Sequence, residues 1–254
     1  MKLSEQVIGW TRDAFAAAER DTAVLGISGG KDSAVVAAIL VKAIGPENVF
    51  GVMMPNGEQK DIADSQQVIA ELGINGLLVN IADQYEASVR PAQLVSPAPD
   101  CSMESGELVP GVESKINVAP RLRMTKLYEI AQSLGEYGRK ACVVGTGNKA
   151  EGYVGYCTKW GDMACDLNPI KDLWVHEVLQ VGDELGYFPN IVHKAPDDGL
   201  SGKTDEERLG FRYEDVYRSV EGGEVPAEVR AMIEARHRAN LHKQTPIPFF
   251  ERCR

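Results

Sequence analysis

The sequence contains no uninterrupted apolar stretch long enough to cross a lipid bilayer. Its longest strongly apolar run, Ala34–Val41, is closed by Lys42, whereas a membrane-spanning helix needs about 20 apolar residues. The first residues mix charged and apolar side chains around Trp10, unlike the basic start and continuous apolar core of a secretory signal. We therefore expect neither a membrane protein nor a secreted one.

The five cysteines are too scattered for a disulfide framework or a metal site. They stand at positions 101, 142, 157, 165 and 253 and form no C-x-x-C pair, which is the spacing typical of zinc and iron–sulfur ligands. An odd number also leaves one cysteine without a disulfide partner inside the chain. These features predict a protein of the reducing cytoplasm.

Basic residues are outnumbered by acidic ones, with 27 Lys and Arg against 37 Asp and Glu, so the formal net charge is −10. A chain of this charge repels polyanions at long range, and nucleic acid is not an expected partner. Small anionic ligands remain possible partners where basic side chains gather locally.

The length and composition are typical of a globular chain, with 254 residues, 44% hydrophobic and 25% charged side chains. We expect a single domain over 1–254.

Short apolar runs alternate with helical patterns along the chain. We expect strands over 22–27, 48–54, 76–81 and 141–145, and helices over 4–20, 32–44, 60–72, 120–134, 172–185 and 226–242. Such alternation predicts an α/β fold, a doubly wound parallel sheet with helices on both faces. Prolines and glycines predict a partly ordered excursion over 83–118. This excursion and the polar loop over 196–204 are candidate lids.

The turn after the first strand has the composition of a phosphate-binding site. It reads Gly26-Ile27-Ser28-Gly29-Gly30-Lys31-Asp32-Ser33 and leads from a strand into a helix. Glycines let the backbone approach a phosphate, and the unpaired N–H groups of a helix start attract anions. Asp32 would repel phosphates unless a cation lies between them, so it indicates Mg²⁺. The alternative without a ligand is a helix N-terminus capped by Ser28 and Asp32.

Two other motifs share part of this turn. A Walker A loop requires glycine where Leu25 stands and Ser or Thr where Asp32 stands, so the turn departs from that motif twice. Gly26–Gly30 also fits G-x-S-x-G, the nucleophile elbow of serine hydrolases, with Ser28 as the nucleophile. That elbow normally follows several strands, and Asp32 has no role in it. A serine hydrolase nevertheless stays open as an alternative.

A second glycine turn, Gly145–Glu151, follows the last expected strand. Ligands of doubly wound sheets bind at the carboxyl ends of the strands where the strand order reverses. We therefore expect the two turns to face each other across that crevice. Glu151 would then supply a second carboxylate to the cation at Asp32, whereas a solvated helix residue is the alternative interpretation.

Several segments together resemble a known enzyme family. The Ser28–Ser33 turn resembles the S-G-G-x-D-S signature of the ATP pyrophosphatases, which adenylate their substrates. Asn117–Met124, Gly145–Glu151 and Gly155–Asp162 resemble NAD synthetases in order and spacing, over nearly the whole chain. The resemblance implies an adenine nucleotide alpha hydrolase-like, Rossmann-like fold. It also implies a ligase that amidates deamido-NAD (nicotinic acid adenine dinucleotide) with ammonia and ATP, through an NAD-adenylate, releasing AMP and pyrophosphate.

The same resemblance implies roles for individual residues. The metal, Mg²⁺, would be held by Asp32 and Glu151. ATP would be held by Gly26, Ile27, Ser28, Gly29, Gly30, Lys31, Asp32, Ser33 and Thr146. Deamido-NAD would contact Arg121, Lys159, Asp166, His242 and Lys243, and the catalytic residues would be Asp32 and Lys159. The family often has Lys at Val175 and Ser or Thr at Asp197, so these two positions receive no role.

The expected nitrogen donor is free ammonia. The sheet pattern begins by Thr22 and leaves no room for a glutaminase domain, although a separate amidotransferase subunit stays open. The resemblance further implies a homodimer. Another adenylating ATP pyrophosphatase, GMP synthetase-like or tRNA-thiolating, is the alternative within the fold. Thiolation of tRNA predicts paired catalytic cysteines and a basic face, and this sequence has neither paired cysteines nor a basic balance.

Overall fold

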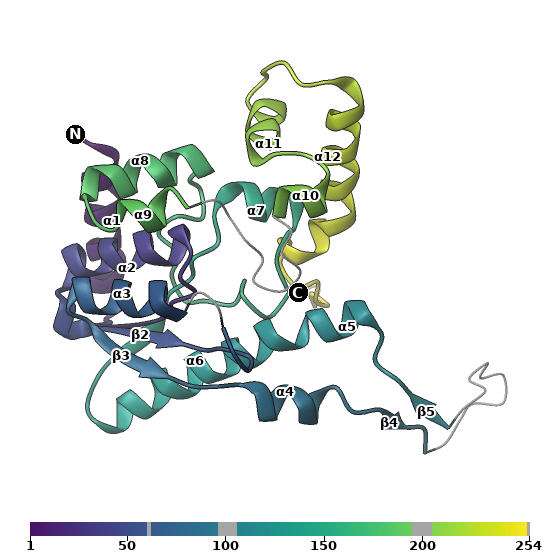
Figure 1. The fold of residues 1–254 in the computed structure, drawn as a ribbon, viewed down its shortest axis with the longest axis horizontal. Helices are drawn as coiled ribbons and strands as arrows, with labels where there is room; N and C mark the ends of the chain where they lie inside the picture. The colour runs from purple at the N-terminus through teal and green to yellow at the C-terminus, as the bar shows by residue number, and fades with distance from the viewer. Residues whose placement is uncertain (60–61, 96–105, 195–204, 253–254) are drawn as a thin grey trace.

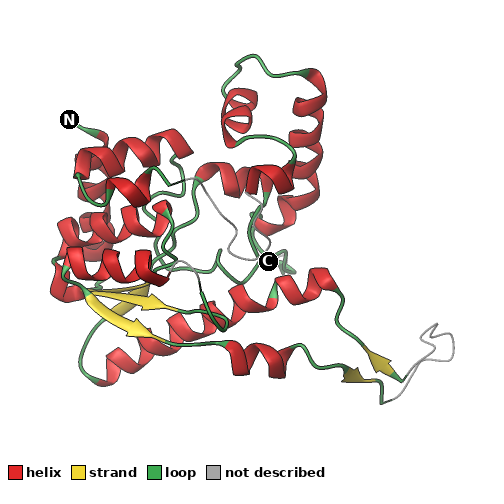
Figure 2. Cartoon of the chain, in the orientation of Figure 1, coloured by secondary structure: helices red, strands yellow, loops and turns green. Residues whose placement is uncertain are grey.

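The computed structural model describes residues 1–59, 62–95, 106–194 and 205–252, and a four-stranded parallel sheet lies at its centre (Figures 1 and 2). Its strands are β1 (Thr22–Gly26), β2 (Val49–Met53), β3 (Asn75–Leu78) and β6 (Ala141–Val143). They run in the order β3-β2-β1-β6, and Ala23 of β1 is paired with Val49 on one side and Cys142 on the other. The strand order therefore reverses between β1 and β6.

Helices cover both faces of this sheet, as Figure 1 shows. One face carries α1 (Leu3–Ala17), α2 (Lys31–Ile44), α3 (Ile62–Leu72), α8 (Val175–Leu185) and α9 (Pro189–Val192), and the other carries α4 (Ala82–Ser88) and α6 (Val118–Glu136). Successive side chains of β1 enter opposite cores, since Leu25 packs beneath α2 and Val24 packs beneath α6. The predicted α/β fold with helices on both faces is confirmed.

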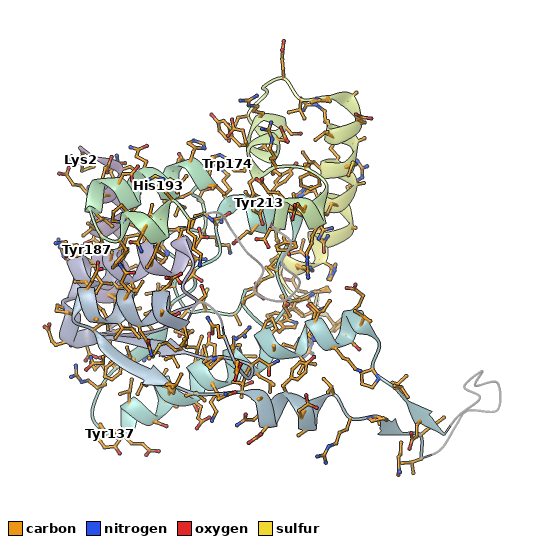
Figure 3. The ribbon with its side chains drawn as sticks, viewed as in Figure 1. Lys2, Tyr137, Trp174, Tyr187, His193 and Tyr213 are labelled. Atoms are coloured by element: carbon orange, nitrogen blue, oxygen red, sulfur yellow. The ribbon has the colours of Figure 1, made fainter. Side chains whose placement is uncertain are left out.

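Four further helices form a smaller layer at the carboxyl edge of the sheet. They are α7 (Lys149–Val154), α10 (Asp205–Leu209), α11 (Tyr213–Val220) and α12 (Ala227–Asn240), followed by the 3₁₀ turn η2 (Leu241–Lys243). Their apolar side chains pack in a cluster that includes Trp174 and Tyr213, both labelled in Figure 3. Because α7 follows β6 directly, this layer lies beside the two glycine turns. The single domain over 1–254 stays a prediction.

The excursion over 83–118 contains short regular elements among its described residues. It contains most of α4, the antiparallel pair β4 (Ala92–Gln93) and β5 (Glu107–Leu108), and α5 (Val112–Ile116). Pro91 and Pro110 stand at the borders of these short elements, where proline is tolerated. These short elements agree with the prediction of a partly ordered excursion, of which residues 96–105 lie outside the described part of the chain.

The predicted lid over 196–204 lies outside the described residues.

The 3₁₀ turn η1 (Pro46–Asn48) connects α2 to β2. None of the described helices is both long enough and apolar enough to cross a membrane.

Candidate active site

The first glycine turn is held in shape by its own serine hydroxyls. Gly29 has φ +82°, a conformation that glycine adopts without steric cost. The Gly30 N–H donates to Ser28 Oγ at 3.2 Å, the Ser28 N–H donates to Ser33 Oγ at 3.3 Å, and Ser33 Oγ donates to the Gly30 carbonyl at 3.0 Å. Within the described residues no side chain caps the start of α2 at Gly30. Its first N–H groups therefore have no side-chain acceptor, as an anion cradle requires.

The second glycine turn closes its helix start with side chains. Asn148 Oδ1 accepts from the Glu151 N–H at 3.1 Å, and Glu151 Oε2 accepts from the Asn148 N–H at 3.1 Å, which is a capping box. A Cβ atom on Gly145 would lie 2.6 Å from Cys165 Sγ, so the chain needs glycine at this close approach. Thr146, the predicted ATP contact, follows Gly145 and is half-buried.

The two turns meet, as expected from the reversal of strand order. Asn148 Nδ2 donates to Asp32 Oδ1 at 3.3 Å, although the two residues are 116 positions apart in the chain. Asp32 lies in the first turn of α2, and Glu151 lies in the first turn of α7. The two turns therefore face each other as expected, whereas a shared metal role for the two acids stays a prediction.

Charges of both signs are concentrated between the turns. Lys31 Nζ lies 2.9 Å from Asp32 Oδ2, and the two side chains are only 12% and 17% exposed. Burial and the nearby Asp32 carboxylate together raise the pKa of Glu151 to about 8. The shift means that the second negative charge is disfavoured here, so an added cation would be stabilised.

The donor atoms fit Mg²⁺ in a particular way. Mg²⁺ prefers oxygen ligands and is commonly held by one or two carboxylates together with substrate phosphates and water. Asp32 and Glu151 offer such carboxylates, and no group of three or more acids, histidines or cysteines suited to a metal occurs in the part of the chain that is described. Mg²⁺ held by these two residues would therefore need further oxygens from ATP or water.

Sequence reasoning missed a second layer of polar residues around this cluster. Tyr213 Oη donates to Asp205 Oδ2 at 3.4 Å, and the Tyr213 N–H donates to Glu206 Oε1 at 2.9 Å. Burial and the Asp205 carboxylate raise the pKa of Tyr156 to about 12. Asp205 begins the five-residue helix α10, which is too short to show a periodic pattern in the sequence. Asn148 was missed for its contact with Asp32, although an N-x-x-E pattern signals its capping role.

Three of the five predicted dinucleotide contacts are linked to one another by hydrogen bonds, and a fourth bonds to the same loop. Arg121 Nε donates to the Lys159 carbonyl at 3.3 Å, and Lys159 Nζ donates to the His242 carbonyl at 2.6 Å. Lys243 Nζ donates to the carbonyls of Gly155 and Cys157 at 2.7 and 2.8 Å. The end of the chain after α12 is therefore tied to the loop that carries Lys159.

Asp166, the fifth predicted contact, lies at the other end of the same helix face. Its Oδ1 accepts from Tyr128 Oη at 3.1 Å, and its Oδ2 accepts from the Val143 N–H at 2.8 Å. Tyr128 and Arg121 are seven residues apart in α6, so they share one helix face and are separated by roughly 10 Å along its axis. These residues line a strip along α6 rather than a single point.

The serine hydrolase alternative receives no support from these contacts. The Ser28 hydroxyl bonds within its own turn, whereas the ring nitrogens of His193 and His237 bond Asp183 and the Tyr153 carbonyl. No hydrogen bond joins Ser28 to any of the four histidines within the described residues, so the base of a hydrolase is not paired with this hydroxyl. Val175, where the family often has Lys, packs against the apolar cluster of the helical layer. Asp197 lies outside the described residues.

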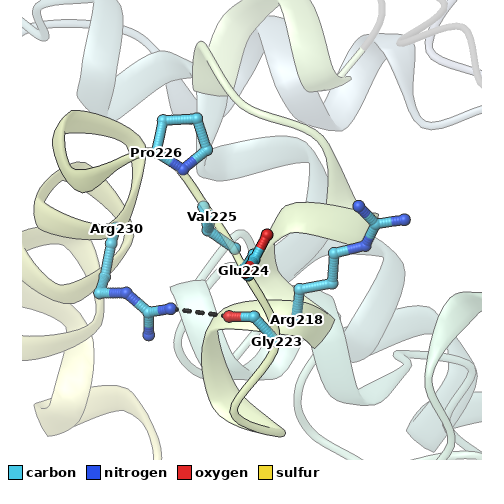
Figure 4. Close-up of a pocket in the computed structure, with 6 residues that line it drawn as sticks. All are labelled: Arg218, Gly223, Glu224, Val225, Pro226 and Arg230. Carbon is cyan, nitrogen blue, oxygen red and sulfur yellow. Dashed lines mark hydrogen bonds between the residues drawn. The ribbon is translucent and has the colours of Figure 1, made fainter.

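A pocket of about 710 Å³ lies elsewhere, between α11 and α12 (Figure 4). Arg218 and Arg230 line it together with residues 223–226. Arg230 Nη2 donates to the Gly223 carbonyl at 2.9 Å, and Arg218 Nε donates to Glu214 at 2.9 Å. Because both guanidinium groups already bond to the protein, this pocket is not a strong candidate for an anion site.

Comparison with known sequences decides the family. The profile of NAD synthase matches residues 3–246. The chain belongs to the NAD synthase family. An enzyme named NH(3)-dependent NAD(+) synthetase from Carboxydothermus hydrogenoformans is 35% identical over 95% of this chain and 93% of its own length. One of the same name from Methanococcoides burtonii is 40% identical over 88% of this chain and 84% of its own length.

Solved structures of the family have the same fold. The NMN synthetase from Francisella tularensis superposes with a TM-score of 0.83 at 31% identity, over 97% of this chain and 96% of that one. The NH3-dependent NAD synthetase from Campylobacter jejuni gives a TM-score of 0.76 at 24% identity, over 98% of both chains. The family resemblance drawn from the motifs is confirmed, together with the fold that it implied.

Proposed function

We propose that this chain is an ammonia-dependent NAD⁺ synthetase, a ligase that amidates deamido-NAD with ATP and ammonia. Relatives of that name, 35% and 40% identical over most of the chain, support the assignment. The observation that carries it within the structure is the meeting of the two turns, where Asn148 of the second contacts Asp32 of the first. An open helix start faces an acid pair there, which suits a nucleotide triphosphate bound with a cation.

The proposed reaction has two steps. The nicotinate carboxylate attacks the α-phosphorus of ATP, a new P–O bond forms, and the bond to pyrophosphate breaks. Ammonia then attacks the carbonyl carbon of the mixed anhydride, the bond to AMP breaks, and the nitrogen loses a proton to leave the amide. The attacking carboxylate is already ionised at neutral pH, so the first step needs no general base.

Charge is the main obstacle to the first step. Two like charges about 4 Å apart repel by roughly 1 kcal/mol in water, and by several times more at the lower effective dielectric near a protein. We assign ATP to Gly26–Ser33 and Thr146, whose backbone and hydroxyl groups donate to phosphate oxygens. We assign Mg²⁺ to Asp32 and Glu151, where it would neutralise phosphate charge when bound.

We assign the dinucleotide to the strip along α6. Arg121 and Lys159 supply positive charge there, and Asp166 supplies an acceptor at its far end, with His242 and Lys243 closing it from the chain end after α12. The hydrogen bonds from Arg121 to Lys159 and from Lys159 to His242 support this grouping. Lys159 is the proposed catalytic side chain of this group.

One observation favours a second acceptor. The NMN synthetase from Francisella tularensis is 31% identical to this chain and superposes with a TM-score of 0.83. A synthetase whose product is that mononucleotide uses the corresponding acid, nicotinic acid mononucleotide, which carries the same reacting carboxylate. Adenylation of the nicotinate carboxylate beside the two glycine turns would be common to both acceptors, and the strip along α6 would distinguish them.

The test is product analysis with purified protein, ATP and Mg²⁺. Deamido-NAD and nicotinic acid mononucleotide are supplied in separate reactions, each with ammonium or with glutamine. We expect NAD and AMP in equal amounts from deamido-NAD and ammonium. A preference for the mononucleotide would establish the second candidate, and the absence of AMP with either acceptor would overturn both.

We also propose a homodimer, as the family resemblance implies. Apolar side chains on the excursion support an interface there, because Val112 and Leu108 are 74% and 61% exposed. Light scattering after size-exclusion chromatography should give twice 27.7 kDa. A mass of one chain at micromolar concentration would contradict the proposal.

A further inference from the structure

Lys31 places a positive charge inside the acidic cluster. Its Nζ lies 2.9 Å from Asp32 Oδ2, with only 12% of the side chain exposed. Besides Asp32 on the same helix, Glu151 of α7 and Asp205 of α10 act on this ammonium electrostatically. The site between the two turns therefore already contains one cation that belongs to the protein.

The other groups around Asp32 leave little freedom for this carboxylate. Asp32 Oδ1 accepts from Asn148 Nδ2 at 3.3 Å, so both of its oxygens have protein partners. Glu151 Oε2 is likewise occupied by the Asn148 N–H at 3.1 Å. A divalent cation that binds Asp32 must therefore compete with the Lys31 ammonium at Oδ2 or with the Asn148 amide at Oδ1. In either case it lies on the same carboxylate as the Lys31 ammonium.

We propose that the Lys31 ammonium is the counter-ion of this acidic cluster before ATP binds, and that it opposes divalent-cation binding until the nucleotide phosphates draw it away from Asp32. The inference rests on the proposed function, since it concerns the metal pair Asp32 and Glu151. It adds a role for Lys31 that goes beyond contact with ATP. Metal and nucleotide would then bind with positive coupling, each raising the affinity of the other.

The physical reason is repulsion between two cations at one carboxylate. An ammonium 2.9 Å from Asp32 Oδ2 would lie within a few ångströms of any metal on that carboxylate, and low exposure weakens the screening of this repulsion by solvent. Phosphates at the start of α2 offer the ammonium a new partner. Lys31 is the first residue of α2, and its flexible four-carbon stem allows the ammonium to move there.

The test measures Mn²⁺ binding without nucleotide, by electron paramagnetic resonance of the free ion. We expect Lys31→Gln to bind Mn²⁺ at least tenfold more tightly than the wild type, whereas Lys31→Arg, which keeps the charge, binds as weakly as the wild type. The melting temperature of metal-free Lys31→Gln should fall and should recover with Mn²⁺. Lys31→Met removes the same charge and is measured in parallel. It replaces the glutamine variant in the comparison if that variant does not fold.

Lys149→Met is the matched control. It removes a lysine charge from neighbouring α7, but Lys149 Nζ pairs at 3.0 Å with Asp172, whose side chain is 92% exposed. We expect its Mn²⁺ affinity to equal that of the wild type. Equal Mn²⁺ affinity of Lys31→Gln and the wild type, or equal tightening in Lys31→Arg, would overturn the inference. If the wild type still makes NAD or NMN in that case, the proposed function stands and only the role of Lys31 is lost.

Discussion

The two glycine turns both lead from a parallel strand into a helix, but they complete the helix start differently. In the first turn, Ser28 and Ser33 bond to the turn itself, and the start of α2 carries no side-chain cap among the described residues. In the second turn, Asn148 and Glu151 cap α7 reciprocally. One helix start is therefore open to an anion, and the other is closed by the protein.

This difference divides the chemistry between the turns. The open start of α2 can receive phosphate oxygens, because its free N–H groups and the helix dipole favour negative charge. The closed start of α7 instead orients an acid and an amide toward Asp32, with Asn148 Nδ2 at 3.3 Å from its Oδ1. Similar local sequences thus produce a ligand cradle on one side and a rigid acidic partner on the other.

The largest effect is expected from Asp32→Asn, which removes a charge from the open turn without removing its shape. Pyrophosphate release should fall at least about 100-fold, since preorganised electrostatic groups of this kind contribute that much or more. Far-UV circular dichroism should be unchanged. Asp172→Asn is the control, because that acid faces solvent at 92% exposure, and it should turn over normally. Normal turnover by Asp32→Asn would contradict the metal role.

Gly29→Ala should damage the open turn through its backbone. The φ of +82° at Gly29 costs a side chain about 1–2 kcal/mol of stability, and the distorted cradle should raise the KM for ATP. Gly152→Ala is the matched control in α7, where an added Cβ meets nothing within 4 Å. That change should stabilise the protein by about 0.5–1 kcal/mol. Chemical denaturation measures the free energy of unfolding of both variants. A change of the same sign in the two would contradict the role given to the φ of Gly29.

Asn148 allows the cap of the closed turn to be separated from its contact with Asp32. Asn148→Ala should cost about 1 kcal/mol of folding free energy, because the start of α7 loses its cap. Asn148→Ser keeps a capping oxygen but loses the donor to Asp32. The two variants should therefore differ in stability and lose activity to a similar degree. Full activity in the serine variant would show that the contact at 3.3 Å is dispensable.

The smallest effect concerns a third helix start, which is completed by a distant residue. The Ser4 N–H at the start of α1 donates to Glu184 Oε2 of α8 at 2.8 Å. Hydrogen bonds from Gln180 and Ser4 lower the pKa of Glu184 to about 2, from an ordinary value of 4.5. The stabilisation is therefore complete above pH 4.5 and is lost as the pH falls through 2.

Melting curves over that acidic range test this third case. The melting temperature of Glu184→Gln should lie furthest below that of the wild type above pH 4.5. The two melting temperatures should converge as the pH approaches 2. The difference in melting temperature should be small, because solvent reaches the half-buried Glu184 carboxylate and screens its interactions. A constant difference between the two proteins at all pH values would contradict the assignment of the carboxylate.

The sequence predicted most accurately those helices and strands whose apolar pattern is long or ends at a glycine turn. The apolar run of β1 ends at a glycine turn, so its position and that of α2 followed within one residue. The six-residue α7 and the five-residue α10 carried no comparable pattern. At the site, Asp32 and Glu151 could be paired by the rule for strand-order reversal, whereas the contact of Tyr213 with Asp205 could not.

The sequence by itself determined the alternation of strands and helices, the two glycine turns and the residue types that accept a phosphate and a cation. These are local properties, since apolar periodicity and glycine dihedral freedom act over a few residues. Only the tertiary structure decided that one turn is open and the other closed, and that Lys31 lies within an acidic cluster. Those outcomes depend on burial and on contacts such as Asn148 with Asp32, which join segments 116 residues apart and acquire their energies only when the chain is folded.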